Sequence, residues 1–256
     1  MPTSSSTHLL LIPTYNAGPK LRQTVAEALE AWSPVWVVVD GSNDGSDQDL
    51  ESLAQPGMDL KILRMPHNRG KGAAVLHGIE KAAEQGFTHV LSMDSDGQHP
   101  ASEINRFMQR SIEQPTAMIL GQPIFDESAP TERVLGRRLA NGCTAIVSVG
   151  GGIGDCLFGF RVYPLAPLRT AMHETRWARR FDFDPEVAVR MSWKGVPAVN
   201  EPCPVRYFKP GQGGVSHFNY LRDNVLLTSM FVRLFAGSLF RLPQLLRRDR
   251  WAMNGD

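Results

Sequence analysis

Short apolar runs alternate with amphipathic segments over the first half of the chain. Five runs of four to six residues are rich in Leu, Val, Ile and Met, as expected for buried strands. They occupy residues 9–12, 35–39, 60–65, 90–93 and 117–120. Segments with helical periodicity lie between them, and strands that alternate with helices are typical of a mainly parallel sheet covered by helices. The pattern predicts an α/β fold.

Two of the intervening segments show the helical period clearly. Their apolar faces consist of Leu21, Val25, Leu29 and Trp32, and of Val75, Ile79 and Ala83. Proline is favoured in the first turn of a helix. Pro19 therefore suits the start of the first helix, and Pro100 suits the start of another that carries Ile104 and Phe107.

The second half of the chain is less regular. A polar connector at residues 126–132 leads to a predicted helix near residues 133–147 and then to three glycines at 150–152. We expect residues 122–217 to extend the same sheet and to form one domain together with residues 8–121.

The two ends of the chain differ from this domain. Residues 1–7 are polar, lack the pattern of a secretory signal and are predicted to form a disordered leader. Residues 218–256 are predicted to form an amphipathic helical tail. The longest stretch of this tail without a charged or amide side chain, residues 225–232, is eight residues long. A single helix needs roughly 20 apolar residues to cross a bilayer, so we expect the tail not to span one.

Composition narrows the function classes. The chain has 256 residues with 42% apolar content, enough for one large domain. The net charge of +1 gives no general attraction to nucleic acid, and no nucleic-acid partner is expected. Cys143, Cys156 and Cys203 are too few for a disulfide framework, which favours a reducing cytoplasmic compartment.

The segment Asp94-Ser95-Asp96 carries the most informative chemistry. It follows a predicted buried strand and precedes the polar loop 97–100. Two carboxylates at this spacing suit a hard divalent cation, which in turn can hold a diphosphate. Gln98 continues the alternation, and oxygen ligands favour Mn²⁺ or Mg²⁺ over zinc.

Other polar residues follow the remaining strands of the first half. Ligands of open α/β sheets bind at the carboxyl ends of the strands. Three groups meet this condition: Pro13, Tyr15 and Asn16; Asp40 and Ser42; and the glycine-rich turn 68–72 with Lys71. Asp40 can accept a hydrogen bond from a base or a ribose, whereas Asp44 fits a helix cap as well as a ligand contact.

In this order, these segments resemble the nucleotide-sugar half of a family 2 glycosyltransferase with the GT-A fold. The D-x-D-x-Q run resembles that of polyprenyl-phosphate sugar synthases, which implies Asp94, Asp96 and Gln98 as metal ligands and Ser95 and Lys71 beside the donor. Family members usually carry two adjacent acids after the second strand. Here Val39 replaces the first of them, and Asp40 is the second.

The resemblance implies a donor half, residues 8–121, and an acceptor half, residues 122–217, and it continues in the acceptor half. Residues 155–161 resemble a D-x-x-x-G-F-R segment, which implies that Asp155 is a general base or an acceptor positioner and that Arg161 binds phosphate. It also places Glu186 near the acceptor, although a helix-start acid explains this residue equally well. Residues 206–217 resemble a loop that closes over the diphosphate. In that loop Arg206 and His217 are implied catalytic residues, and Lys209 and Ser216 are implied phosphate contacts.

The resemblance thus implies a metal-dependent, inverting transferase that moves a sugar from a nucleotide-diphosphate donor to a lipid or lipid-linked acceptor. We expect it to act in the cytoplasm at the inner face of the cell membrane, with the arginine-rich tail in the membrane interface. The tail could equally pack on the protein or in a dimer. A soluble or polysaccharide hydroxyl acceptor and a catalytically silent membrane scaffold remain alternatives. The sequence leaves the oligomeric state open.

Overall fold

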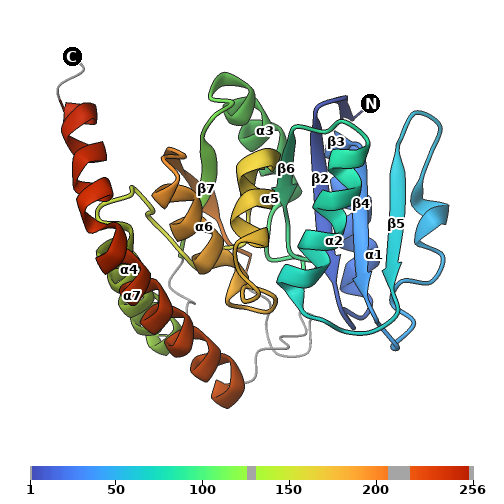
Figure 1. Cartoon of the computed structure of the whole chain (residues 1–256). Helices are drawn as coiled ribbons and strands as arrows, with labels where there is room; N and C mark the ends of the chain where they lie inside the picture. Colours follow the sequence, from blue (N-terminus) through green and yellow to red (C-terminus); the bar gives the residue numbers. More distant parts are fainter. Residues whose placement is uncertain (1, 126–130, 207–219, 254–256) are drawn as a thin grey trace.

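The computed structural model describes residues 2–125, 131–206 and 220–253, except for the side chains of 131–134, 220–221 and 247–253. Its centre is a seven-stranded sheet in the order β5-β4-β2-β6-β8-β7-β9 (Figure 1). The strands are β2 (His8–Thr14), β4 (Val35–Asp40), β5 (Leu60–Met65), β6 (His89–Ser92), β7 (Met118–Ile124), β8 (Arg161–Pro164) and β9 (Ala198–Pro204). All neighbouring strands are parallel except β8, which is antiparallel to β6 and β7.

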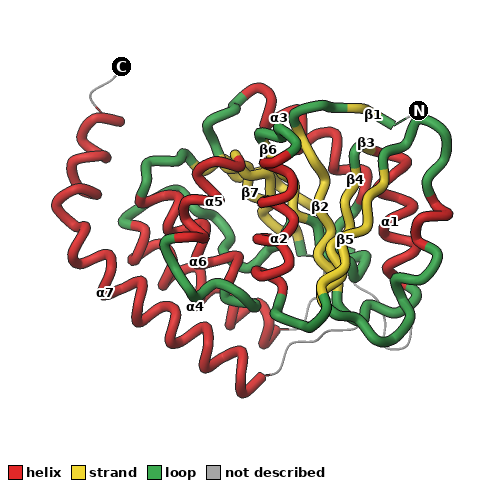
Figure 2. The backbone as a smooth tube through the Cα atoms, turned by 45° about the vertical axis from the view of Figure 1, so that its right-hand side comes forward, coloured by secondary structure: helices red, strands yellow, loops and turns green. Residues whose placement is uncertain are grey.

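Helices connect the strands and cover both faces of the sheet (Figure 2). They are α1 (Lys20–Ala31), α2 (Lys71–Glu84), α3 (Ile104–Glu113), α4 (Thr131–Ser148), α5 (Leu165–His173), α6 (Phe183–Trp193) and α7 (Tyr220–Met253). Two short 3₁₀ helices lie at Leu50–Leu53 and Ala101–Glu103. The elements predicted for the first half are confirmed, and so is the helix predicted near residues 133–147.

The apolar run of β2 has no polar positions because both faces of this strand are covered. Leu9 and Leu11 pack with α2, α5 and α6 on one face of the sheet, and Leu10 and Ile12 pack with α1 and α3 on the other. Successive side chains of a strand point to opposite faces, so a strand covered on both sides must be apolar throughout. The carboxyl ends of β2, β4 and β6 consequently meet at one edge of the sheet.

Three details differ from the expectations. The strand β8 lies between β6 and β7, although it follows both in the chain, because α4 carries the chain back across the sheet. Thr3–Ser4 form β1, which pairs with β3 (Trp32–Ser33), so this part of the predicted disordered leader is ordered. Trp32 therefore belongs to a strand, and its Nε1 donates to the carbonyl oxygen of His8 at 3.2 Å.

The tail is one continuous helix, α7, and not a pair of helices. It runs beside α4 along the side of the domain and packs on α6 through the buried Met230 and Leu234 (Figure 1). Among the described residues, Arg222–Leu246 is the one helical segment long and apolar enough to cross a membrane. This finding concerns length and mean hydropathy alone, and the expectation that the tail does not span a bilayer stays a prediction.

Candidate active site

The loops that follow β2 and β4 are joined by hydrogen bonds. The backbone N–H of Asn16 donates to Ser42 Oγ at 3.0 Å, and the Asn16 side chain exchanges two hydrogen bonds of 2.9 Å with Asn43. Asp44 accepts from the backbone of Gly18 and Ser46, so it ties these loops together and caps no helix. Tyr15 is half-buried beside them, and Pro13 is buried within β2.

Asp40 holds the glycine-rich turn in place. Its two carboxylate oxygens accept the backbone N–H groups of Arg69 at 2.8 Å and Gly70 at 2.6 Å, and the residue is 2% exposed. Burial raises the pKa of Asp40, although these hydrogen bonds and two nearby arginines oppose the shift. The carboxylate therefore orients the turn that precedes α2.

Lys71, the first residue of α2, joins two acids from distant parts of the chain. Its Nζ lies 2.7 Å from Asp94 Oδ1 and 2.7 Å from Asp184 Oδ2. Burial disfavours the charged ammonium, yet the two carboxylates together raise the pKa of Lys71 above its ordinary value. This lysine thus places the end of β6 next to the first turn of α6.

Gly159 makes room for this ion pair. A Cβ at this position would lie 2.6 Å from Lys71 Nζ and 2.7 Å from Asp94 Oδ2. Such distances are far shorter than van der Waals contact. Only glycine lets the backbone before β8 approach the two charged groups so closely.

The two acids of the D-x-D segment occupy different environments. Burial would raise the pKa of Asp94, but Lys71 and other cationic neighbours outweigh it and lower this pKa. The pKa of Asp96 is raised by burial and by the charge of Asp94. Repulsion between neighbouring carboxylates is relieved when a cation binds between them.

His99 supports this loop and does not act as a metal ligand. Its Nδ1 accepts the backbone N–H of Asp94 at 3.0 Å, so the ring proton sits on Nε2, which faces Asp94 Oδ2 at 3.7 Å. The ring is 3% exposed and packs edge-on against Phe158. Burial lowers the pKa of His99 and keeps the ring neutral.

The donor set at the end of β6 fits Mn²⁺ or Mg²⁺. Among the described residues, no three His, Cys, Asp or Glu side chains form a group that could hold a metal ion alone. Mg²⁺ commonly binds through one or two carboxylates and completes its shell with water and substrate phosphates. Asp94 and Asp96 supply that number of carboxylates. The backbone N–H of Gln98 donates to Asp96 Oδ1 at 3.0 Å and fixes that side chain.

Ser95 and Arg206 flank the same loop. The carbonyl oxygen of Ser95 accepts from Thr24 Oγ1 of α1 at 3.3 Å. The backbone N–H of Arg206 donates to the carbonyl oxygen of Gln98, and its side chain pairs with Glu27 at 3.0 Å. The predicted residues Lys209, Ser216 and His217 lie outside the described residues.

Asp155, which the resemblance implies as a base or an acceptor positioner, is buried and 3% exposed. One carboxylate oxygen accepts from Arg137 of α4 at 2.5 Å and from the backbone N–H groups of Leu157 and Phe158. Asn141 of α4 donates to the other oxygen at 3.2 Å. Burial alone would raise the pKa of Asp155, but Arg137 lowers it and keeps the group ionised.

The structure differs from the predictions for Arg161 and Glu186, because both are fully buried. Arg161 donates to the carbonyl oxygens of Phe158, Asp184 and Asp155 and to the hydroxyl of Tyr163. These hydrogen bonds use the guanidinium inside the protein. Arg161 therefore does not contact a ligand phosphate here. Glu186 accepts from Arg190 at 2.8 Å and from Arg233 of α7 at 3.1 Å, so it anchors the tail.

Sequence reasoning missed two residues of the site, Asp184 and Gly159. Asp184 stands two positions before Glu186, and in the sequence both look like first-turn helix acids. Their difference depends on Lys71, which is more than one hundred residues away in the chain. The proximity of Gly159 to Lys71 likewise arises only from the crossing of β8 beside β6.

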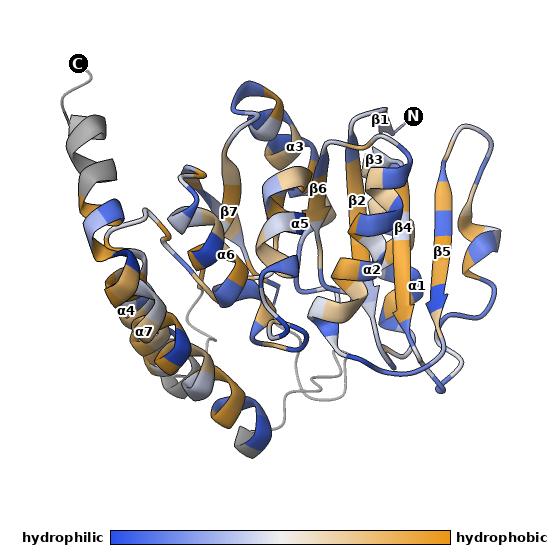
Figure 3. Cartoon of the chain, viewed as in Figure 1, coloured by the Kyte–Doolittle hydropathy of each residue, from blue (hydrophilic) through white to orange (hydrophobic). Residues whose placement is uncertain are grey.

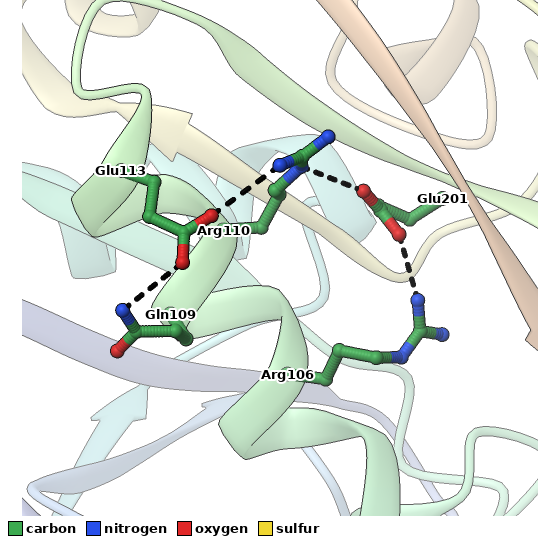
Figure 4. A pocket seen from close by; sticks show the side chains of 5 residues that line it. All are labelled: Arg106, Gln109, Arg110, Glu113 and Glu201. Carbon is green, nitrogen blue, oxygen red and sulfur yellow. Dashed lines mark hydrogen bonds and ion pairs between the residues drawn. The ribbon is translucent and has the colours of Figure 1, made fainter.

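A polar surface pocket lies elsewhere, between α3 and β9 (Figure 4). It is lined by Arg106, Gln109, Arg110, Glu113 and Glu201. Glu201 accepts from Arg106 at 2.7 Å and pairs with Arg110 at 2.9 Å, so the charges of the pocket neutralise one another. None of the predicted site residues lines it.

Known proteins resemble this chain in sequence and in fold. The model of glycosyl transferase family 2 matches residues 10–171. The polyprenol monophosphomannose synthase of Mycolicibacterium smegmatis is 28% identical over 162 residues, which cover 60% of this chain and 60% of that protein. The undecaprenyl-phosphate mannosyltransferase of Micrococcus luteus is 23% identical, over 76% of this chain and 81% of that protein. The chain thus spans about three fifths of the length of the mycobacterial relative.

Two solved structures share the fold. The glucosyl-3-phosphoglycerate synthase of Mycobacterium tuberculosis with Mn²⁺, UDP-glucose and phosphoglyceric acid has a TM-score of 0.60 and 15% identity, and covers 92% of this chain and 79% of that one. TarS of S. aureus with UDP-GlcNAc has a TM-score of 0.58 and 16% identity, and covers 97% and 74%. They confirm the GT-A fold. The family model, which matches over most of the sheet, establishes that the chain belongs to glycosyl transferase family 2.

Proposed function

We propose that this protein transfers a sugar from a nucleotide-diphosphate sugar to a lipid phosphate at a membrane surface. The observation that carries the proposal is the group of acids at the end of β6. Asp94 and Asp96 lie in one loop there, and Lys71 bridges Asp94 to Asp184. Lys71 also begins α2, and the positive end of a helix dipole favours anions. A diphosphate and its cation both find complementary charge there.

The donor class is supported by the proteins that resemble this chain. Solved structures with the same fold hold Mn²⁺ with UDP-glucose, or UDP-GlcNAc. When bound, a divalent cation on Asp94 and Asp96 would neutralise the charge that develops on the departing diphosphate. Either Mn²⁺ or Mg²⁺ meets this requirement in a site of oxygen ligands.

The arrangement of the other acids favours a phosphate acceptor. A hydroxyl acceptor benefits from a general base within hydrogen-bond reach, whereas a phosphate is already ionised. Asp155 is buried against Arg137, and Glu186 is buried between Arg190 and Arg233. Although burial alone would raise the pKa of Asp155, Arg137 lowers it and makes this group a weak base, and both oxygens of Glu186 are occupied by arginines. The phosphate oxygen would attack the anomeric carbon as the bond between that carbon and the diphosphate oxygen breaks, which inverts the configuration.

A membrane-facing surface is available beside the site. Figure 3 shows hydrophobic residues along α4 and α7 at the side of the molecule. Several of the large apolar side chains of these two helices are exposed. They are Leu135, Leu139 and Ile146 of α4, and Val225, Val232, Phe235, Leu239, Phe240, Leu242 and Leu246 of α7. We call this the α4–α7 face. Because Met230, Leu234 and Arg233 hold the middle of α7 against the domain, the helix is positioned to lie in the interface with its free face toward lipid.

A cytoplasmic location at the inner face of the membrane agrees with the three unpaired cysteines. The relatives named after polyprenol and undecaprenyl phosphate support a lipid carrier, and nucleotide sugars are the donors bound in the solved structures.

The test uses acceptors that differ by one group. Radiolabelled UDP-glucose and GDP-mannose are each incubated with Mg²⁺ or Mn²⁺, the protein, and either a polyprenyl phosphate or the corresponding polyprenol in detergent. We expect label in the organic phase with the phosphate alone, and about 10²- to 10³-fold less label with Asp96→Asn. Equal labelling of the polyprenol would show that a hydroxyl is the acceptor. Absence of transfer, together with absence of metal-dependent nucleotide binding, would support the silent scaffold.

A further inference from the structure

We infer that Asp184 is a substrate-binding residue whose Oδ1 accepts a hydrogen bond from a hydroxyl group of the donor sugar. The inference rests on the proposed function, since it presupposes a nucleotide-sugar donor at the D-x-D segment. It assigns a contact to a residue that neither the sequence motif nor the metal site requires.

The first observation is the position of Asp184. Its Oδ2 accepts from Lys71 Nζ at 2.7 Å, and the same ammonium lies 2.7 Å from Asp94 Oδ1. One lysine thus joins Asp184 directly to the first acid of the D-x-D segment. Asp184 therefore belongs to the same charged cluster as the acid that would face the cation and the diphosphate of a donor.

The second observation is the unequal use of the two carboxylate oxygens. The Asp184 side chain is 7% exposed, and among the described residues no group donates to its buried Oδ1. Leaving a buried acceptor without a donor is unfavourable, and more so for a charged group. A ligand hydroxyl is a donor of the right size and charge.

The third observation is the rigidity of the site around Asp184. Its backbone carbonyl oxygen accepts from the buried Arg161 at 2.6 Å, and it stands in the first turn of α6. The turn of residues 178–180 that leads to α6 packs against α2, where the backbone N–H of Ala73 donates to the carbonyl oxygen of Arg179 at 3.1 Å. A carboxylate fixed on both sides can select a hydroxyl by position.

The test measures binding in the absence of an acceptor. Calorimetry compares UDP with UDP-glucose, and GDP with GDP-mannose, in Mg²⁺ for the native protein and for Asp184→Asn. A hydrogen bond to a charged group is worth about 1.5 to 3 kcal/mol, so the variant should lose about 10- to 100-fold in affinity for the nucleotide sugar that binds. Its affinity for the matching nucleoside diphosphate should change by less than about 3-fold, because Asn retains an oxygen for Lys71.

Asp182→Asn serves as the matched control. Asp182 is also buried and lies two positions away, but its partners are the backbone N–H groups of Ala178 and Arg180. This variant should lower the affinities for the sugar nucleotide and the nucleoside diphosphate equally, if at all.

Sugar nucleotides that lack one hydroxyl at a time identify the contact without relying on the variant's fold. One analogue should bind the native protein at least 10-fold more weakly than the complete sugar, and should bind Asp184→Asn no more weakly than the complete sugar does. Equal losses for the nucleoside diphosphate and the sugar nucleotide in Asp184→Asn would overturn the inference and leave the proposed function standing. Failure of the native protein to bind any nucleotide sugar would overturn the proposed function itself.

Discussion

Asp94 in the donor half and Asp155 and Glu186 in the acceptor half use their carboxylates in opposite ways. In the donor half, Asp94 follows a parallel strand, is 33% exposed and faces a lysine and a second acid at the edge of the sheet. In the acceptor half, Asp155 and Glu186 are 3% and 0% exposed and neutralise arginines from α4 and α7. Asp94 is available to a ligand, whereas Asp155 and Glu186 hold the helices that carry the α4–α7 face. An acidic residue in a recognisable motif can therefore serve chemistry or anchoring, and its burial and partners decide which.

The largest expected effect tests the donor half. Asp96→Asn removes one of the two carboxylates available to a cation, so transfer should fall by about 10²- to 10³-fold. The melting temperature should stay the same or rise, because the variant removes repulsion between Asp96 and Asp94. Label transfer and calorimetric melting check both outcomes, with the exposed Asp59→Asn as the control. A variant that loses stability in proportion to activity would show that Asp96 is structural.

The next effect tests the acceptor half. Asp155→Asn leaves the guanidinium of Arg137 without its charged partner, so the free energy of unfolding should fall by about 3 kcal/mol. Denaturant unfolding measures this value, and Arg137→Gln combined with Asp155→Asn should cost less than the sum of the single changes. If the two costs add and transfer alone is lost, Asp155 acts in the reaction and the contrast between the halves fails.

The stability of the protein should depend on pH through the edge of the sheet opposite the candidate active site. The rings of His8 and His89 stack at 4.3 Å at the amino ends of β2 and β6, and His8 contacts Ser111 at 3.2 Å. Burial, together with His89, lowers the pKa of His8 to about 4. The unfolded chain binds this proton near pH 6.5 and the folded chain only near pH 4, so stability should fall as the pH drops between these values.

The expected loss is on the order of 2 kcal/mol, and urea unfolding at a series of pH values measures it. His8→Gln should flatten this part of the profile without changing nucleotide affinity at pH 7.5, because the site lies at the opposite edge. An unchanged slope in the variant would assign the effect to other groups.

The smallest effect concerns the close approach at Gly159. Gly159→Ala would force Lys71 or Asp94 to move, since the new Cβ would stand 2.6 Å from Lys71 Nζ. We expect transfer to fall by about 10-fold with little change in fold, because small displacements of positioning groups reduce rates strongly. Gly142→Ala on α4, where no atom lies within 4 Å, is the matched control and should be neutral or stabilising. Equal rates in the two variants would contradict the close approach.

Much of the donor half could be predicted from the sequence, for a physical reason. Its strands are parallel and buried on both faces, so they are continuous apolar runs, and the residue after each run must lie at the same edge. Asp40, Lys71 and Asp94 were found in this way. The acceptor half could not be read similarly, because β8 enters between two strands that precede it and brings Gly159 against Lys71.

The sequence by itself thus determined the α/β order of elements, the D-x-D segment and the apolar, arginine-rich tail. Only the tertiary structure decided that α7 is a single helix beside α4, that Arg161, Asp155 and Glu186 are internal, and that Asp184 joins the site. Local periodicity and strand ends are properties of neighbouring residues, which a sequence displays directly. Charge pairing across more than one hundred residues depends on how the strands are ordered in the sheet, and no local pattern encodes that order.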